Sequence, residues 1–118
     1  MTVDPAAFAA SFAAEWIAAW NARDLPRILS HYTDDVVFLS PRAAQLVGDG
    51  RVVGKPALEA YWTRALARAP DLHFELIDVY AGYEALTLNY ARADGRKACE
   101  TFEFAADGRV CRSVASYL

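Results

Sequence analysis

The chain has 118 residues, of which 55% are hydrophobic, 13% aromatic and 23% charged, and its formal net charge is −3. This length accommodates one domain spanning residues 1–118, and the high apolar content excludes an intrinsically disordered chain. Because Lys and Arg are scattered and no apolar run approaches the roughly 18 residues of a membrane span, we expect neither a nucleic acid nor a membrane as partner.

The first third of the chain predicts two helices. Asp4 is a suitable N-cap, and Pro5 suits the first helical position. Aromatic residues then recur every four positions, which keeps them on one face of a helix: they are Phe8, Phe12, Trp16 and Trp20. After a break at residues 21–24, a short second helix is predicted over residues 25–31.

The middle of the chain predicts a strand, a loop and a third helix. Residues 36–40 are rich in β-branched and aromatic side chains and are stopped by Pro41, which indicates a strand. Residues 42–54 contain three glycines and predict a loop with room for one short strand. Residues 55–68 have apolar side chains at helical spacing, namely Leu58, Tyr61, Trp62, Ala65 and Leu66.

From residue 72 onward the hydrophobic period changes to two. We predict four strands, over residues 72–80, 85–93, 96–105 and 110–117. Asp94-Gly95 and Asp107-Gly108 separate the last three, and Asp-Gly between alternating runs is a strong hairpin signal. The predicted fold is therefore α+β, a cone-shaped curved antiparallel sheet covered by three helices from the N-terminal half.

The hairpin register decides which side chains face the interior. Two-residue turns place Asn89 opposite Glu100 and Glu100 opposite Ala115. One face then carries Thr87, Asn89, Glu100, Phe102, Phe104, Cys111, Ser113, Ala115 and Tyr117. The other carries Leu86, Leu88, Tyr90, Cys99, Thr101, Val110 and Val114, with an ion pair between Glu103 and Arg112. Since this second face is partly apolar, we expect a homodimer through it. A three-residue turn with a bulge would shift one strand and swap its faces.

Glu100 is the candidate functional residue on the first face. A buried carboxylate without an Arg or Lys partner is costly, so it acquires a raised pKa and a hydrogen-bond partner, or it borders a wet cavity. Asn89 is placed to supply that bond. The alternative is that Glu100 lies near an open sheet edge and is solvated.

Two segments resemble a known family. They are the stretch from Glu15 to Pro41 and the closing pattern Glu100-Thr-Phe-Glu-Phe, Asp107-Gly-Arg-Val and Ala-Ser-Tyr117. Together they resemble the nuclear-transport-factor-2-like superfamily, and within it the SnoaL-like branch related to ketosteroid isomerases and polyketide cyclases. The resemblance covers almost the whole chain and implies the cone-shaped fold. It implies less about function, because the superfamily includes isomerases, cyclases, epoxide hydrolases, dehydratases and non-catalytic members.

The resemblance carries over to individual residues only in part. The catalytic Asp of the ketosteroid isomerases corresponds to Ser40, which cannot take a proton from a carbon acid at neutral pH. The oxyanion-hole Tyr corresponds to Trp16, whose indole N–H donates a hydrogen bond but transfers no proton. A supporting Tyr corresponds to Trp62, a pocket Tyr of some members to Tyr32, and the protonated Asp to Glu100. These matches imply a pocket and argue against ketosteroid isomerisation.

We therefore expect a cavity for a small apolar or carbonyl-bearing metabolite. Its predicted lining is Phe12, Trp16, Tyr32, Phe38, Ser40, Trp62, Asn89, Glu100, Phe102, Ser113 and Tyr117. An enzyme would be a cofactor-independent isomerase, cyclase or dehydratase in which Glu100 is the general acid or base and Asn89 orients it. The alternatives are a non-catalytic ligand-binding protein and a dimerisation domain that uses Leu86, Leu88, Tyr90 and Val114.

Metal binding and export are not expected. Cys99 and Cys111 have no metal-ligand spacing, and neither His31 nor His73 has ligand-forming neighbours. The apolar N-terminal stretch lacks the basic region of a secretion signal. We expect a cytoplasmic protein with reduced thiols and no cofactor.

Overall fold

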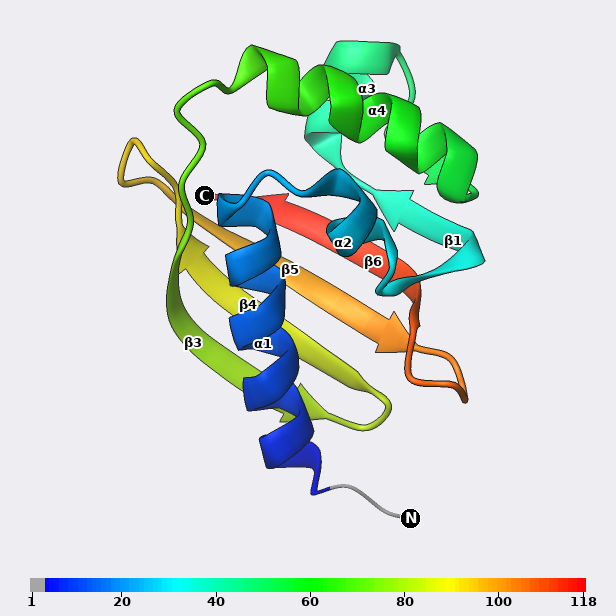
Figure 1. Ribbon diagram of the computed structural model, residues 1–118, viewed down its shortest axis with the longest axis vertical. Helices are drawn as coiled ribbons and strands as arrows, with labels where there is room; N and C mark the ends of the chain where they lie inside the picture. Colours follow the sequence, from blue (N-terminus) through cyan, green and yellow to red (C-terminus); the bar gives the residue numbers. More distant parts are fainter. Residues whose placement is uncertain (1–3) are drawn as a thin grey trace.

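Helices cover one face of a six-stranded curved sheet in the computed structural model, which describes residues 4–118 (Figure 1). The helices are α1 (Pro5–Asn21), α2 (Leu25–Leu29), α3 (Pro41–Val47) and α4 (Lys55–Arg68). The strands are β1 (Tyr32–Leu39), β2 (Arg51–Val53), β3 (Glu75–Gly82), β4 (Ala85–Ala91), β5 (Lys97–Phe104) and β6 (Val110–Tyr117). Their order in the sheet is β2-β1-β6-β5-β4-β3, and β1 and β6 form the parallel pair. The predicted α+β class is confirmed.

The helix starts follow the capping signals of the sequence. Asp4 accepts a hydrogen bond from the backbone N–H of Ala7, and Asp24 caps α2 in the same way. α1 packs across β3, whereas α4 lies over β1 and β2 (Figure 1). Arg23 links the two groups of helices, since its guanidinium donates to the carbonyl of Leu66 and, at 2.7 Å, to that of Ala69, beyond the C-terminus of α4.

The helix α3 corrects the prediction of a loop over residues 42–54, and it makes a fourth helix where three were expected. Ser40 and Pro41 form the same pair of cap and first-turn proline that begins α1. The Ser40 hydroxyl accepts from the N–H of Arg42 at 3.1 Å, and Gly48, with φ +85°, ends the helix. The three glycines of this segment favour a loop and so conceal the signal for a helix. The predicted short strand is confirmed as β2.

The first hairpin has a three-residue turn, so its predicted register is wrong. The N–H of Arg92 donates to the carbonyl of Arg96 at 2.8 Å, which leaves Ala93, Asp94 and Gly95 in the loop, with Gly95 at φ +83°. Compared with a two-residue turn, this shifts the pairing of β4 with β5 by one residue. Asn89 therefore lies opposite Cys99, and Leu88 lies opposite Glu100. Because side chains alternate along a strand, the two faces of β4 are exchanged.

The second hairpin has the same turn but keeps most of the predicted register. The N–H of Ala105 donates to the carbonyl of Arg109, so three residues lie in the loop between them, and Gly108 has φ +83°. A bulge between Glu103 and Phe104 then offsets the shift. Beyond the bulge, the predicted pairs hold: Glu100 with Ala115, Phe102 with Ser113, Glu103 with Arg112 and Ala98 with Tyr117. Before it, Phe104 pairs with Val110 instead of Cys111.

The exchanged faces change the predicted outer surface. Leu86, Leu88 and Tyr90 are buried in the core, as is Val110, so the apolar dimer surface assigned to them is wrong. The outer face carries instead Thr87 and Asn89, together with the predicted Cys99, Thr101 and Val114. Its Glu103–Arg112 ion pair is confirmed, with 2.8 Å between the charged atoms. That this face binds a second copy stays a prediction.

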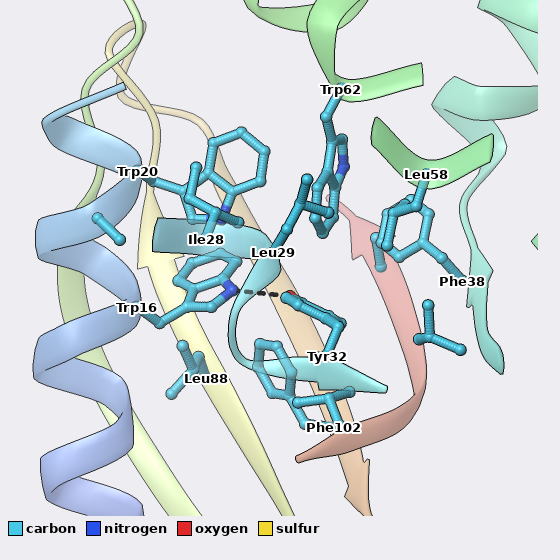
Figure 2. Close-up of a cluster of buried hydrophobic side chains, with 14 of the residues drawn as sticks. Trp16, Trp20, Ile28, Leu29, Tyr32, Phe38, Leu58, Trp62, Leu88 and Phe102 are labelled. Carbon is cyan, nitrogen blue, oxygen red and sulfur yellow. Dashed lines mark hydrogen bonds between the residues drawn. The ribbon is translucent and has the colours of Figure 1, made fainter. Parts of the chain in front are cut away.

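The core lies between α1, α4 and the inner face of the sheet, and Figure 2 shows its central side chains. Tyr32, Ile28, Leu58, Leu88 and Phe102 are almost completely buried. Strand β1 begins at Tyr32, four residues before the predicted start, because the polar run Thr33-Asp34-Asp35 concealed its beginning. No helix among residues 4–118 is long and apolar enough to cross a membrane.

Candidate functional site

A cavity of about 300 Å³ opens between α1, α4 and the inner face of the sheet. This volume is at the lower end of the range of small-molecule sites. Its walls are mostly aromatic, formed by Trp16, Trp20, Phe38, Tyr61, Trp62, Phe74, Tyr90 and Tyr117. Polar and charged groups also line it: Glu100 is buried, whereas Arg42, Asp71, His73 and Asp94 are exposed and Arg92 is half-buried. The cavity therefore has a buried end and a charged mouth.

The aromatic walls are held in place by edge-to-face and stacked contacts. Trp16 stacks on Phe74 with ring centroids 5.7 Å apart, and Trp20 meets Trp62 edge to face at 5.0 Å. Asn21, at the end of α1, fixes the backbone of Phe74 by donating to its carbonyl at 2.9 Å and accepting from its N–H at 2.7 Å. These contacts make the walls a packed and preformed surface.

Glu100 lies at the buried end of the cavity and is only 3% exposed. The Ser113 hydroxyl donates a hydrogen bond to its Oε2 at 2.8 Å, and Leu88 and Ala115 lie opposite it on the neighbouring strands. Burial raises the pKa of Glu100 from 4.5 to about 7, although the bond from Ser113 acts to lower it. No Arg or Lys among residues 4–118 forms an ion pair with this carboxylate. Glu100 is therefore poised to hold or release a proton near neutral pH.

Several tyrosines lie close enough to Glu100 for its charge to raise the pKa of each. Burial, together with the nearby Glu100 charge, raises the pKa of Tyr117 to about 12, although a hydrogen bond with Ser40 acts to lower it. Burial, reinforced by Glu100, also raises the pKa of Tyr90 and of Tyr32. These phenols keep their protons at neutral pH, so those that line the cavity can donate hydrogen bonds to an oxygen atom of a ligand.

Trp16 and Tyr32 form a buried hydrogen bond next to the cavity. The indole Nε1–H of Trp16 donates to the Tyr32 hydroxyl at 3.1 Å, as Figure 2 shows with a dashed line. The indole is thus already engaged within the protein, and this bond fixes Trp16 as a wall.

Removing this acceptor is expected to destabilise the fold. In Tyr32→Phe the buried Trp16 N–H loses its partner, and we expect the free energy of unfolding to fall by about 1–3 kcal/mol. Urea denaturation measures the loss, with Tyr83→Phe as control, since Tyr83 is 90% exposed. Equal stability of the two variants would show that the Trp16–Tyr32 bond contributes nothing.

The structure places the predicted lining residues in three locations. Trp16, Phe38, Trp62, Glu100 and Tyr117 line the cavity. Phe12, Tyr32, Ser40, Phe102 and Ser113 are buried but lie behind its walls. Asn89 is on the outer face and does not reach Glu100; Ser113 is the residue that bonds it. The orienting role predicted for Asn89 is therefore wrong, because it depended on the two-residue turn.

Several lining residues were missed from the sequence. Tyr90 was assigned to the outer face by the wrong register, and Trp20 was recognised only as part of the helical stripe. Arg42 was assigned to a loop, and Arg92 to a strand end with no role. Only the spacing of Trp20 from Trp16 gave a signal that could have identified a wall residue. Across residues 4–118, no group of three or more His, Cys, Asp or Glu is arranged to hold a metal ion.

Comparisons with known proteins identify relatives of this chain. The family model of the SnoaL-like domain matches residues 13–113. A SnoaL-like protein of unknown function from Burkholderia thailandensis E264 is 47% identical, with a TM-score of 0.91 over 95% of each chain.

More distant structures share the fold alone. An NTF2-like protein of unknown function from Burkholderia pseudomallei K96243 is 17% identical, with a TM-score of 0.76 over 94% of this chain and 91% of that one. A protein of unknown function with a cystatin-like fold from Methylobium petroleophilum PM1 is 17% identical, with a TM-score of 0.75 over 99% of this chain and 79% of that one. No curated protein matches the chain.

Proposed function

This chain belongs to the SnoaL-like family, and from this premise we propose that it is a cofactor-independent enzyme that moves a proton on a small, mostly apolar carbonyl compound. The reaction class is isomerisation, cyclisation or dehydration, with Glu100 as general base and acid. The observation that carries the proposal is the single buried carboxylate at the end of the aromatic cavity, with its pKa raised to about 7. A group that titrates near the working pH is an efficient proton carrier.

The chemistry follows from the arrangement of the polar groups. Ionised Glu100 takes a proton from the carbon next to the carbonyl, and the electron pair of the broken C–H bond moves to form an enolate. A tyrosine O–H at the cavity wall, from Tyr90 or Tyr117, donates a hydrogen bond to the developing oxyanion. In a β,γ-unsaturated carbonyl compound the enolate extends to the γ carbon, so neutral Glu100 can return the proton there, which moves the double bond into conjugation and completes an isomerisation. Every proton and electron pair is conserved, and no co-reactant is needed.

The second candidate is a ligand-binding protein without turnover, and the position of Ser40 favours it. Its hydroxyl accepts from the Arg42 N–H and caps α3, so it cannot replace a catalytic carboxylate. The other two acids that line the cavity, Asp71 and Asp94, are exposed at its mouth. Among the described residues, Glu100 is thus the only acid at the buried end.

Deuterium exchange distinguishes the two candidates. A panel of small cyclic ketones and lactones is first screened by thermal shift, and each stabilising compound is then incubated with the protein in D₂O and followed by NMR. We expect wild-type protein to exchange the proton next to the carbonyl, with a rate that rises with pH through about 7, because ionised Glu100 is the base. Glu100→Gln should slow the exchange about a hundredfold or more while the compound still binds.

Glu103→Gln is the matched control, because Glu103 lies on the same strand but faces outward and pairs with Arg112. Its exchange rate should equal that of wild type. Binding without exchange in wild type would support the ligand-binding candidate. Exchange that survives in Glu100→Gln would remove Glu100 from the mechanism, and the failure of every compound to bind would contradict the proposed substrate class.

A further inference from the structure

Two arginines approach one aromatic ring at the cavity mouth from different parts of the chain. The guanidinium of Arg42, from α3, lies 4.5 Å from the ring centroid of Tyr117. That of Arg92, from the turn after β4, lies 5.3 Å from the same centroid. All three residues line the cavity. Two positive charges thus lie close to one aromatic ring of the entrance, although like charges repel each other.

Neither guanidinium forms an ion pair among the described residues, although the Arg92 charge contributes to lowering the pKa of the neighbouring Asp94. Within the described part of the chain, no side-chain N–H of Arg42 or Arg92 donates a hydrogen bond to another residue; Arg42 donates to the Ser40 hydroxyl only through its backbone N–H. The Nε of Arg92 is moreover buried without a hydrogen-bond partner. A buried N–H without an acceptor carries a desolvation cost, and a guanidinium offers five donors. The mouth therefore holds donors and positive charge that an anionic group can satisfy.

The acids nearby do not remove this opportunity. Asp94 accepts from the backbone N–H of Arg96 at 2.9 Å, and its carboxylate lies 3.8 Å from the Arg96 side chain. Asp71 is exposed at the rim. Both would, however, repel a ligand group with two negative charges. A group with a single charge and a planar pair of oxygens fits best, because it matches the fork of a guanidinium.

We propose that the ligand of this cavity is an apolar carboxylic acid, whose carboxylate is bound by Arg42 and Arg92 at the mouth while its ring system lies against the aromatic walls. This inference rests on the proposed function only because both place the ligand in the same cavity. It adds the substrate class: the reacting carbonyl lies toward the buried Glu100, and the carboxylate lies nearer the surface, beside the guanidinium groups of Arg42 and Arg92.

Matched acids and amides test the proposal without any turnover. Benzoate, naphthoate and biphenylcarboxylate are compared with their primary amides by isothermal titration calorimetry at neutral pH and low salt. These probes have no proton next to a carbonyl for Glu100 to remove, and each amide differs from its acid mainly in charge. We expect wild-type protein to bind at least one acid about tenfold or more tightly than its amide, and added salt to reduce that preference.

The double variant Arg42→Gln/Arg92→Gln should lose the preference for the acid while it keeps affinity for the amide. Arg64→Gln is the control, because Arg64 is exposed on α4 and does not line the cavity. The proposal is overturned if acids and amides bind equally, if no acid binds, or if the double variant keeps the preference. Glu100→Gln separates the two proposals: an acid preference that persists in this variant, together with an absence of deuterium exchange in wild type, refutes catalysis and retains carboxylate recognition.

Discussion

The free energy of unfolding is expected to fall by about 2–3 kcal/mol between pH 5 and pH 8 through Glu100 alone. The pKa of this carboxyl is 4.5 in a free side chain and about 7 in the folded protein. The folded state therefore binds the proton more tightly over this range, and the unfolded state ionises first. Stability therefore decreases as pH rises from about 4.5 to about 7, and it levels off above about pH 7, where both states are ionised.

Urea denaturation at several pH values measures this effect in wild type and in Glu100→Gln. The variant cannot ionise, so its stability should change less over the same range. Glu103→Gln should retain the wild-type slope, because Glu103 is half exposed and paired with Arg112. Glu15 does not obscure the result: Arg27 and His31 lower its pKa to about 2, and its stabilising effect is lost only in stronger acid. Parallel curves for wild type and Glu100→Gln would show that the carboxylate is solvated.

Phe102→Ala is expected to cost about 3–5 kcal/mol of stability, the largest loss from a single substitution proposed for this protein. Phe102 is fully buried and meets Phe12 and Trp16 edge to face, with ring centroids 5.0 and 5.5 Å apart. Figure 2 shows it below Tyr32, at the lower edge of the cluster in this view. Truncation leaves a void between α1 and the sheet, where both sides are fixed by other contacts.

Thermal and chemical denaturation of Phe102→Ala quantify the loss. Tyr83→Ala removes an aromatic ring of similar size from a position that is 90% exposed, and it should change stability by less than about 0.5 kcal/mol. A loss below about 1 kcal/mol for Phe102→Ala would mean that the sheet and α1 close over the void.

The sequence was sufficient for elements whose pattern and boundary signals agree. The helix at Lys55–Arg68 has the predicted bounds, because its apolar period is regular and its limits are marked by Gly54 and Pro70. The inward orientation of Glu100 was also predicted correctly. That success depended partly on the bulge near Cys111, which compensated for a turn longer than the one assumed.

The rest of the site depends on turn geometry and on contacts between distant segments. Asp94-Gly95 is compatible with a two-residue or a three-residue turn, and the choice decides whether Asn89 or Tyr90 faces the cavity. Likewise, nothing near Arg42 in the sequence indicates that it meets Tyr117, some 75 residues later in the chain. The hydrophobic periodicity of the sequence predicts the faces of a single helix or strand, whereas the charged mouth of the cavity forms only when distant segments pack together.

The two hairpins differ in how strongly a change of turn length would alter the side chains that face the cavity. At the second hairpin, the bulge reverses the shift in register that the three-residue turn causes. A two-residue turn without the bulge would therefore still place Ser113 next to Glu100. At the first no such compensation exists: a change of turn would rotate β4, bring Asn89 inward and expose Leu88 to water. Gly95 and Gly108 share one backbone conformation, yet the integrity of the cavity depends unequally on them, and sequence drift should be tolerated more readily around Gly108.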